Sequence, residues 1–252
     1  DAVVEVLGWD EAFLGVDSDD PHALAGRVQS RVLESTELHC TVGIGQNKLQ
    51  AKLATGFGKP AGIFQLTQDT WFEVLGDRGT DALWGIGSKT AKRLAALGIH
   101  TVNELAATDP AELAAKVGPT TGPWLVLLAR GGGDSPVSDE PYIARGRGRE
   151  TTFQQDLEDW ADVRREVLTL AHSLIEDLER PVARVVLKVR YKPFITKTHG
   201  RALKEPSTDP AAIEEAVLIA LDRFEGRRPV RLLGVRIEFA LLPAESAGDT
   251  GD

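Results

Sequence analysis

Apolar and polar positions follow both the strand period and the helix period in the first part of this chain. Short apolar runs predict strands at residues 3–8, 12–16, 39–44 and 62–66. Apolar positions at helical spacing predict helices over residues 21–37 and 47–55. We expect the second helix to stop at Gly56 and Gly58, because glycine commonly ends helices. This mixture indicates an α/β arrangement.

From residue 69 to residue 130 the pattern changes to short helices separated by glycine. They are predicted at Asp69–Leu75, Ser88–Leu97, Val102–Ala106, Pro110–Lys116 and Pro123–Ala129. The pair Asp109-Pro110 is a good helix entry, because proline is tolerated in the first turn. The segment Gly131–Pro136 has the composition of a linker.

The last part of the chain shows its periods most clearly. Strands are predicted at residues 147–154, 183–192, 197–203 and 231–240, and helices at 157–178 and 210–225. The order β-α-β-β-α-β predicts a four-stranded antiparallel sheet with both helices on one face. The polar residues after Pro243 predict a disordered tail. We therefore expect the chain as a whole to belong to the α+β class.

Composition narrows the classes of protein that fit. The 252 residues are 42% hydrophobic and 27% charged, which is ordinary for a globular protein. The one cysteine, Cys40, excludes an intrachain disulfide and favours a reducing, cytoplasmic setting. No apolar run approaches the roughly 18–20 residues of a membrane span, so we expect no membrane partner. The chain lacks methionine and enters an apolar run just after Asp1, which we interpret as a missing front end.

Charge is distributed unevenly along the chain. The net charge of −9 disfavours a generic nucleic-acid binder. However, residues 145–240 carry 18 basic and 16 acidic groups, whereas residues 1–75 carry 5 and 11. Basic residues are concentrated late in the chain, and their placement on one face matters more than their sum.

Two adjacent carboxylates, Asp10 and Glu11, lie between the first two predicted strands. Carboxylates at a strand tip can bind hard divalent cations such as Mg²⁺. Two such ions can stabilise the attacking and leaving oxygens of a phosphoryl transfer. A solvated turn with no chemical role is the other interpretation, and the dipeptide alone does not decide between them.

Three lysines follow in a segment that is rich in glycine. Lys48 and Lys52 are four residues apart and should share one face of a helix. Lys59 lies in a loop flanked by glycine, where a mobile ammonium group could reach a triphosphate. A solvated lysine face explains the same pattern.

A glycine-x-glycine turn, Gly85-Ile86-Gly87, leads into a predicted helix that starts with Ser88 and Lys89. Glycine lets backbone N–H groups approach a DNA phosphate, and the start of a helix favours negative charge. This pattern is typical of the second half of a helix-hairpin-helix, which holds the DNA backbone without reading sequence. A plain packing unit of two helices is the alternative.

The last predicted sheet separates apolar from basic residues by parity. Between residues 184 and 192 the even positions are Arg184, Val186, Lys188, Arg190 and Lys192, and the odd positions are Val185, Leu187, Val189 and Tyr191. Further basic positions are Arg145, Arg147 and Arg149 before or in the first strand, Lys197, His199 and Arg201 at one parity of the third, and Arg236 in the fourth. Successive side chains of a strand point to opposite faces, so one face should be apolar and the other nearly all cationic.

Such an open basic face suits a grip on DNA phosphates that weakens steeply with salt. A merely solvated face is the alternative, but solvated faces usually mix both signs of charge. We expect this face to mix them very little.

Taken together and in this order, these motifs resemble the Y-family DNA polymerases. The matching stretches are Trp9-Asp10-Glu11-Ala12-Phe13-Leu14, Val42–Lys48 with Ala51–Ala54 and Lys59–Gly62, the Gly85-Ile86-Gly87 turn with its helix, and residues 145–240. The resemblance covers nearly the whole chain to about residue 242. It implies a partial polymerase palm at 1–75, a helix-hairpin-helix thumb at 76–132, a linker at 133–146, a little finger at 147–242 and a tail at 243–252.

The resemblance also implies roles for particular residues. Asp10 and Glu11 would be catalytic and would hold two Mg²⁺ ions, or Mn²⁺, and Lys59 would contact the incoming nucleotide. DNA would bind at Gly85, Ile86, Gly87, Ser88 and Lys89, and at Arg145, Arg147, Arg149, Lys188, Arg190, Lys192, Lys197, Arg201 and Arg236. The implied partners are primer–template DNA and dNTPs, for a monomeric enzyme.

The chain departs from the family pattern in several places. The first metal-ligand aspartate, the fingers and the residue that excludes ribonucleotides would precede Asp1. Trp9 stands where a small residue is usual, and Gly15 where an acidic residue is common. No short clamp-binding peptide is evident after Pro243, which leaves a sliding clamp in doubt as a partner.

The function expected from the sequence is low-fidelity, template-directed DNA synthesis of the translesion type, in damage tolerance. We expect this chain alone to be inactive. Two alternatives remain: a catalytically inactive homologue that serves as a DNA-binding adaptor, and a simple helix-hairpin-helix module.

Overall fold

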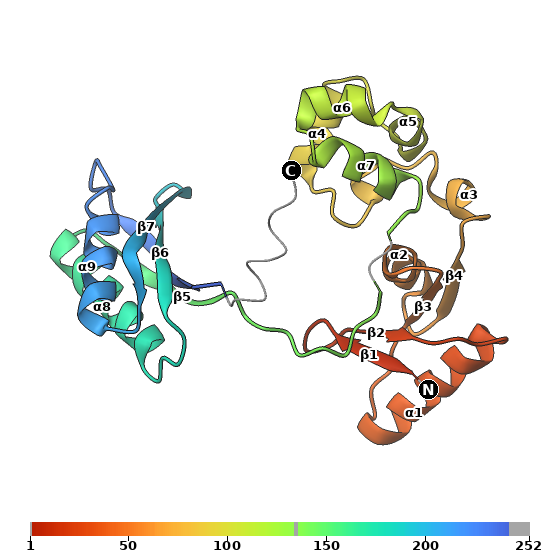
Figure 1. The fold of residues 1–252 in the computed structure, drawn as a ribbon, viewed down its shortest axis with the longest axis horizontal. Coiled ribbons are helices and arrows are strands. Elements are labelled where there is room, and N and C mark those ends of the chain that lie inside the picture. Colours follow the sequence, from red (N-terminus) through yellow and green to blue (C-terminus); the bar gives the residue numbers. More distant parts are fainter. Residues whose placement is uncertain (1, 134–135, 242–252) are drawn as a thin grey trace. The chain divides into compact units, whose positions relative to one another are not determined.

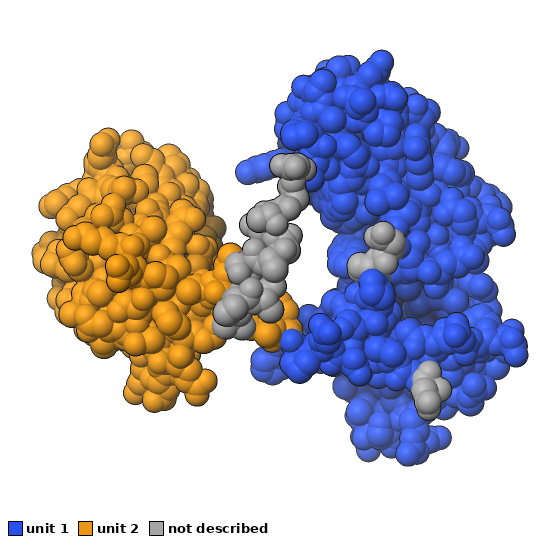
Figure 2. All heavy atoms as spheres, viewed as in Figure 1, with its two compact units in different colours: residues 1–141 blue, residues 142–252 orange. Residues whose placement is uncertain are grey.

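The computed structural model describes residues 2–133 and 136–241. The chain divides into two compact units, unit 1 (Asp1–Pro141) and unit 2 (Tyr142–Asp252) (Figures 1 and 2). The expected tail, residues 243–252, lies outside the described residues, as does part of the expected linker. Among the helices of the described ranges, none is long and apolar enough to cross a membrane. The four boundaries between the five sequence-based segments stay predictions.

The first half of unit 1 is built from two small sheets and two helices. Its elements are β1 (Val3–Val6), β2 (Ala12–Gly15), α1 (Pro21–Thr36), β3 (Val42–Gly45), α2 (Lys48–Gly58) and β4 (Ile63–Leu66). β1 and β2 form an antiparallel hairpin, whereas β3 and β4 are parallel and are joined through α2. α2 packs against β3 so closely that a Cβ at Gly43 would lie 2.1 Å from the Ala51 carbonyl oxygen.

All six of these elements were predicted, and α2 is longer than expected. The helix expected over residues 47–55 continues through Gly56 and ends at Gly58, the second of the two glycines expected to stop it. Glycine lowers helix stability without forbidding helical dihedral angles. The Gly62 N–H still donates to the Gly58 carbonyl at 2.9 Å, so the chain turns directly from α2 toward β4.

The second half of unit 1 consists of short helices, as predicted. They are α3 (Trp71–Leu75), a 3₁₀ turn (Thr80–Ala82), α4 (Ser88–Ala95), α5 (Val102–Ala107), α6 (Pro110–Val117) and α7 (Thr121–Ala129). Side chains cap several of them: Asp109 accepts from two N–H groups at the start of α6, and Thr101 with Glu104 forms a capping box on α5. These caps satisfy the first N–H groups of α5 and α6, and all five short α-helices are stabilised by burying apolar side chains in one core.

The end of α7 and the turn after it are held by polar side chains from the start of α2 and from α3. Indole Nε1 of Trp71 donates to the Ala129 carbonyl at 2.7 Å, and Asn47 Nδ2 and Gln50 Nε2 donate to the Gly131 carbonyl at 2.9 and 3.2 Å. Gly131 has φ +74°, and a Cβ there would lie 2.8 Å from Cδ2 of Trp71. We call these residues the α7 junction. One hydrophobic core continues from α2 and β4 into the helices, so the two halves pack as one unit.

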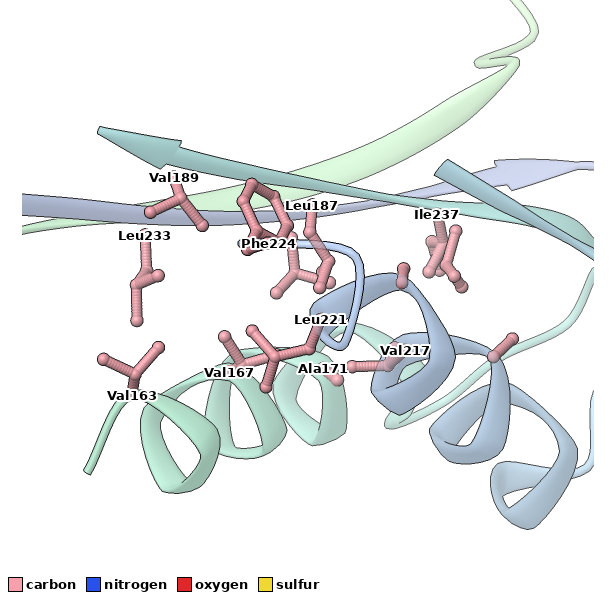
Figure 3. Close-up of a cluster of buried hydrophobic side chains, with 14 of the residues drawn as sticks. Val163, Val167, Ala171, Leu187, Val189, Val217, Leu221, Phe224, Leu233 and Ile237 are labelled. Carbon is pink, nitrogen blue, oxygen red and sulfur yellow. The ribbon is translucent and has the colours of Figure 1, made fainter. Parts of the chain in front are cut away.

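Unit 2 is the predicted β-α-β-β-α-β fold. Its elements are β5 (Gly146–Leu157), α8 (Trp160–Ile175), β6 (Val182–Tyr191), β7 (Ile195–Ser207), α9 (Pro210–Leu221) and β8 (Val230–Phe239). The strand order is β5-β8-β6-β7, and every neighbouring pair is antiparallel. Side chains of α8 and α9, such as Val167 and Val217, pack with Leu187 and Ile237 on one face of the sheet (Figure 3).

Trp71 gives a direct test of the α7 junction. Trp71→Phe removes the donor to the buried Ala129 carbonyl and leaves a small cavity, so we expect a loss of about 3 kcal/mol in unfolding free energy. The control is Trp124→Phe, because Trp124 is half-exposed and should lose less than about 1 kcal/mol. Urea denaturation followed by far-UV circular dichroism measures both losses, and equal losses would contradict the role of the junction.

Candidate active site and nucleic-acid interface

The two predicted metal-binding carboxylates lie in the loop of the β1–β2 hairpin. The Glu11 carbonyl accepts from the Leu7 and Gly8 N–H groups at 2.9 and 3.3 Å, which closes the loop. Both carboxylate residues are exposed, whereas Phe13, two residues further on, is buried and anchors β2. The hairpin thus presents Asp10 and Glu11 to solvent from a fixed base.

The two lysines at helical spacing share one face of α2, as predicted, and each binds a carboxylate of the hairpin. Lys52 Nζ lies 2.6 Å from Glu11 Oε1, and Lys48 Nζ lies 2.5 Å from Glu5 Oε2. The hydrogen bond from Lys52, helped by its charge and that of Lys59, holds the pKa of Glu11 below its usual range. This face of α2 is therefore engaged with the hairpin and is not simply solvated.

Trp84 connects this lysine face to the glycine turn at residues 85–87. Lys52 Nζ lies 5.9 Å from the Trp84 ring centroid, and the Phe13 ring meets Trp84 edge-on with 6.4 Å between centroids. A cleft of about 520 Å³ is lined by Lys52 and Leu53 on α2 and by residues 81–87. The carboxylate hairpin and the glycine turn, predicted as separate motifs, thus meet at Lys52.

The glycine turn itself presents backbone groups. Gly85 has φ +101°, and a Cβ there would lie 2.9 Å from the Trp124 ring. Gly87 is the N-cap of α4, and no side chain caps this helix start in the part of the chain that the structure describes. Ser88 and Lys89 are exposed, so the first N–H groups of α4 are open to an anion.

The side chain of Ile86, the middle residue of the glycine turn, lies in the core. It is only 4% exposed and belongs to the hydrophobic core of unit 1. The Ile86 N–H donates to the Leu83 carbonyl at 3.0 Å. The Ile86 side chain therefore anchors the turn, while Gly85, Gly87, Ser88 and Lys89 lie at the surface. A backbone contact with DNA at these five residues stays a prediction.

The face of the unit 2 sheet opposite to α8 and α9 is called here the open face. Residues that are paired across antiparallel strands point to the same side. Register pairs Lys188 with Gly234, Arg190 with Leu232, and Val186 with Arg236. Lys188, Arg190 and Arg236 therefore share the open face, as predicted, while Val185, Leu187 and Val189 are buried on the helix side.

The prediction that the third strand adds cations to the same face is wrong. Register pairs Lys197 with Val189, His199 with Leu187, and Arg201 with Val185, so all three lie on the helix side. The His199 ring packs on Phe224 with 4.5 Å between centroids, which places it there independently. Parity along one strand cannot reveal the face, because the face depends on register across the hairpin.

The same correction applies to the first strand. Arg147 pairs with Ile237 and Arg149 with Val235, so both point to the helix side. Arg147 Nη2 donates to the Glu176 carbonyl at the end of α8 at 2.9 Å, which is a structural role. The backbone of Arg145 joins the sheet, because its carbonyl accepts from the Phe239 N–H.

The expectation that the open face barely mixes charges is also wrong. Lys188 pairs with Glu150 from β5. Glu238 from β8 lies 3.7 Å from Arg184 and 3.8 Å from Arg236. Lys192 lies 3.8 Å from Asp156. The charged side chains that β6 places on the open face are all cationic, but the neighbouring strands add carboxylates to the same face. DNA phosphates would therefore compete with these carboxylates for the lysines and arginines.

Comparisons with known proteins agree with this arrangement. A family model described as the impB/mucB/samB family matches residues 1–56, and the model of that family's C-terminal domain matches residues 145–248. A model of a SAM-like helix-hairpin-helix tandem matches residues 82–121, which contain the glycine turn.

Named relatives match most of this chain in sequence, and a solved structure matches it in fold. DNA polymerase IV 2 of Mycobacterium tuberculosis is 48% identical over 94% of this chain and 70% of its own length. DNA polymerase IV of Methanoculleus marisnigri is 35% identical over 93% of this chain and 66% of its own. A Y-family DNA polymerase chimera of Dbh and Dpo4 superposes with a TM-score of 0.78, 25% identity, and coverage of 94% of this chain and 70% of its own.

The chain therefore belongs to the Y family of DNA-directed DNA polymerases. Within that family, the relatives that it matches over most of its length are DNA polymerases IV.

Lys52 gives a test of the carboxylate geometry. Lys52→Met removes the hydrogen bond and the charge that lower the pKa of Glu11, so this pKa should rise toward the ordinary value of about 4.3. In the unmodified chain the interaction is present above that value and is lost as pH falls through the lower pKa of the folded state. Carboxyl NMR titration measures the change.

Arg31→Met is the matched control, because Arg31 pairs with Glu34 at 3.5 Å on an exposed helix face far along the chain from the hairpin. It should leave the titration of Glu11 unchanged. An identical Glu11 titration in the Lys52 variant would contradict the ion pair.

Proposed function

We propose that this chain supplies the metal-binding carboxylates, thumb and little finger of a translesion-type polymerase that acts in DNA damage tolerance. The observation that carries the proposal is the position of Glu11. The Lys52 ammonium group lies 2.6 Å from its carboxylate and borders the cleft formed by residues 81–87. A reacting centre at the hairpin would thus adjoin a turn able to hold a DNA phosphate.

The donor set at the hairpin fits Mg²⁺, and Mn²⁺ as a substitute. Asp10 and Glu11 offer hard carboxylate oxygens, and the ion pair of Glu11 with Lys52 supports a negatively charged Glu11 that could bind a cation. Residues 2–133 and 136–241 contain no group of three or more metal-ligating side chains, so further ligands must complete the site. When bound, two such ions would activate the primer hydroxyl and neutralise the leaving pyrophosphate.

The residues of this chain would position the reactants. Lys59 lies at the end of α2, is exposed and acts electrostatically on Glu11, so its ammonium group can reach a triphosphate beside the carboxylates. When a metal ion binds, Glu11 would exchange its contact with Lys52 for that ion. The work of the protein in this reaction is positioning and electrostatic stabilisation.

Primer–template DNA would contact both units. The N–H groups at Gly87–Lys89 suit one backbone phosphate, and the open face with Lys188, Arg190 and Arg236 suits others. The solved relatives include an insertion ternary complex of the Dbh DNA polymerase. A cytoplasmic location and a monomeric state stay predictions. Binding to a sliding clamp stays in doubt, as the sequence left it.

Glu11→Ala tests the catalytic assignment in a protein that also contains the segment its relatives carry beyond this match. Losing a metal ligand should lower primer extension at least about a thousandfold, because several kcal/mol of charge stabilisation disappear. Glu34→Ala, an exposed carboxylate on α1, should extend normally. Unchanged extension by the Glu11 variant would remove the assignment, and no extension by the unmodified protein would favour the adaptor alternative.

Glu150→Gln tests the open face. The change frees Lys188 and removes a charge that repels phosphates, so the affinity of the chain for duplex DNA should rise severalfold. Glu215→Gln on the outer side of α9 removes the same charge without touching the sheet and should change the affinity far less. Fluorescence anisotropy at two salt concentrations measures both. Equal effects of the two variants would show that the open face does not bind DNA.

A further inference from the structure

The turn between β6 and β7 carries an exposed aromatic tip. Phe194 is 75% exposed, and the neighbouring Ile195 is 43% exposed. The strands below the tip are held in register by pairs such as Tyr191 with Ile195, and Arg190 Nε donates to Thr196 Oγ1 at 3.0 Å. The tip is therefore a fixed feature at the end of a ladder.

The backbone at Phe194 is in an unusual conformation. Its φ is +65°, in the left-handed region that bulky side chains rarely adopt. A phenylalanine here is disfavoured locally and gains nothing from burial. Strained residues of this kind are concentrated where a ligand is bound, so this residue type at this position indicates a role outside the fold.

The chain around the tip is cationic on both sides. From residue 180 to residue 204 there are eight lysines and arginines and no carboxylate. Register places Lys188 and Arg190 on the open face and Lys197 and Arg201 on the helix side. The Lys192 side chain is 74% exposed beside the tip, with Asp156 3.8 Å away. An aromatic ring flanked by cations on both faces of a ribbon fits a polyanion that also carries flat apolar groups.

We propose that Phe194 stacks on an unpaired base of single-stranded DNA, while Lys192 and Lys197 hold the flanking phosphates. This inference rests on the proposed function of unit 2 as a DNA-binding unit and adds a new contact to it. Stacking on an aromatic side chain is independent of sequence, because every base has a π-face. A base that is stacked inside a duplex presents no free face, which is why the proposed occupant is single-stranded.

The test is binding of the whole chain to a short single-stranded oligonucleotide that contains 2-aminopurine. Phe194→Ala should weaken binding about tenfold and abolish the quenching of 2-aminopurine that stacking causes. The salt dependence should keep its slope, because no cation is lost. Phe194→Trp should restore both binding and quenching.

Tyr142→Ala is the matched control, since Tyr142 is an 87% exposed aromatic residue of the same unit. It should bind as the unmodified chain does. Phe194→Ala binding within twofold of the unmodified chain, or an equal loss for Tyr142→Ala, would overturn the inference, and so would an equal loss toward a polyglutamate probe. Salt-sensitive binding that ignores Phe194 would overturn only this inference, whereas no binding by the unmodified chain would overturn the proposed function of unit 2 as well.

Discussion

The carbonyl groups at the end of α7 and in the turn after it impose the constraint on which unit 1 depends, because they have no partners inside the helix. Asn47 and Gln50 at the start of α2 hydrogen-bond the Gly131 carbonyl, which fixes α2 to the thumb helices. Further along α2, Lys52 binds Glu11 of the hairpin. One helix thus sets the distance between the candidate metal ligands and the glycine turn that suits a DNA phosphate.

The basic side chains on the open face of unit 2 are not unpaired, because carboxylates of the same sheet bind them. Cations on the open face are partly neutralised by Glu150 and Glu238, so bound phosphates would replace internal carboxylates. Exposed ion pairs of this kind contribute little to stability, typically below about 1 kcal/mol each, and can therefore be exchanged without unfolding the sheet. A chain with a net charge of −9 can in this way still present a surface that binds DNA.

Local sequence patterns were sufficient to predict the strands and helices. They were insufficient to predict which residues of different elements contact each other. Apolar spacing predicted the strands and helices, because burial of one face dictates the period. The contact between Lys52 and Glu11 joins residues 41 positions apart, and no local signal marks it. Lys197 and Arg201 were assigned to the wrong face because a strand's parity does not contain its register. The sequence motif of the glycine turn did not indicate that its middle residue, Ile86, belongs to the hydrophobic core.

The central claim is that the β1–β2 hairpin binds a divalent ion beside the thumb turn. The most direct measurement is a titration of the chain with Mn²⁺, followed by paramagnetic broadening of its backbone and indole NMR signals. Residues 8–12 and the indole of Trp84 should broaden first, because Lys52 links Glu11 to that ring. Broadening centred on Glu150 and Asp156, with the hairpin signals unchanged, would contradict it.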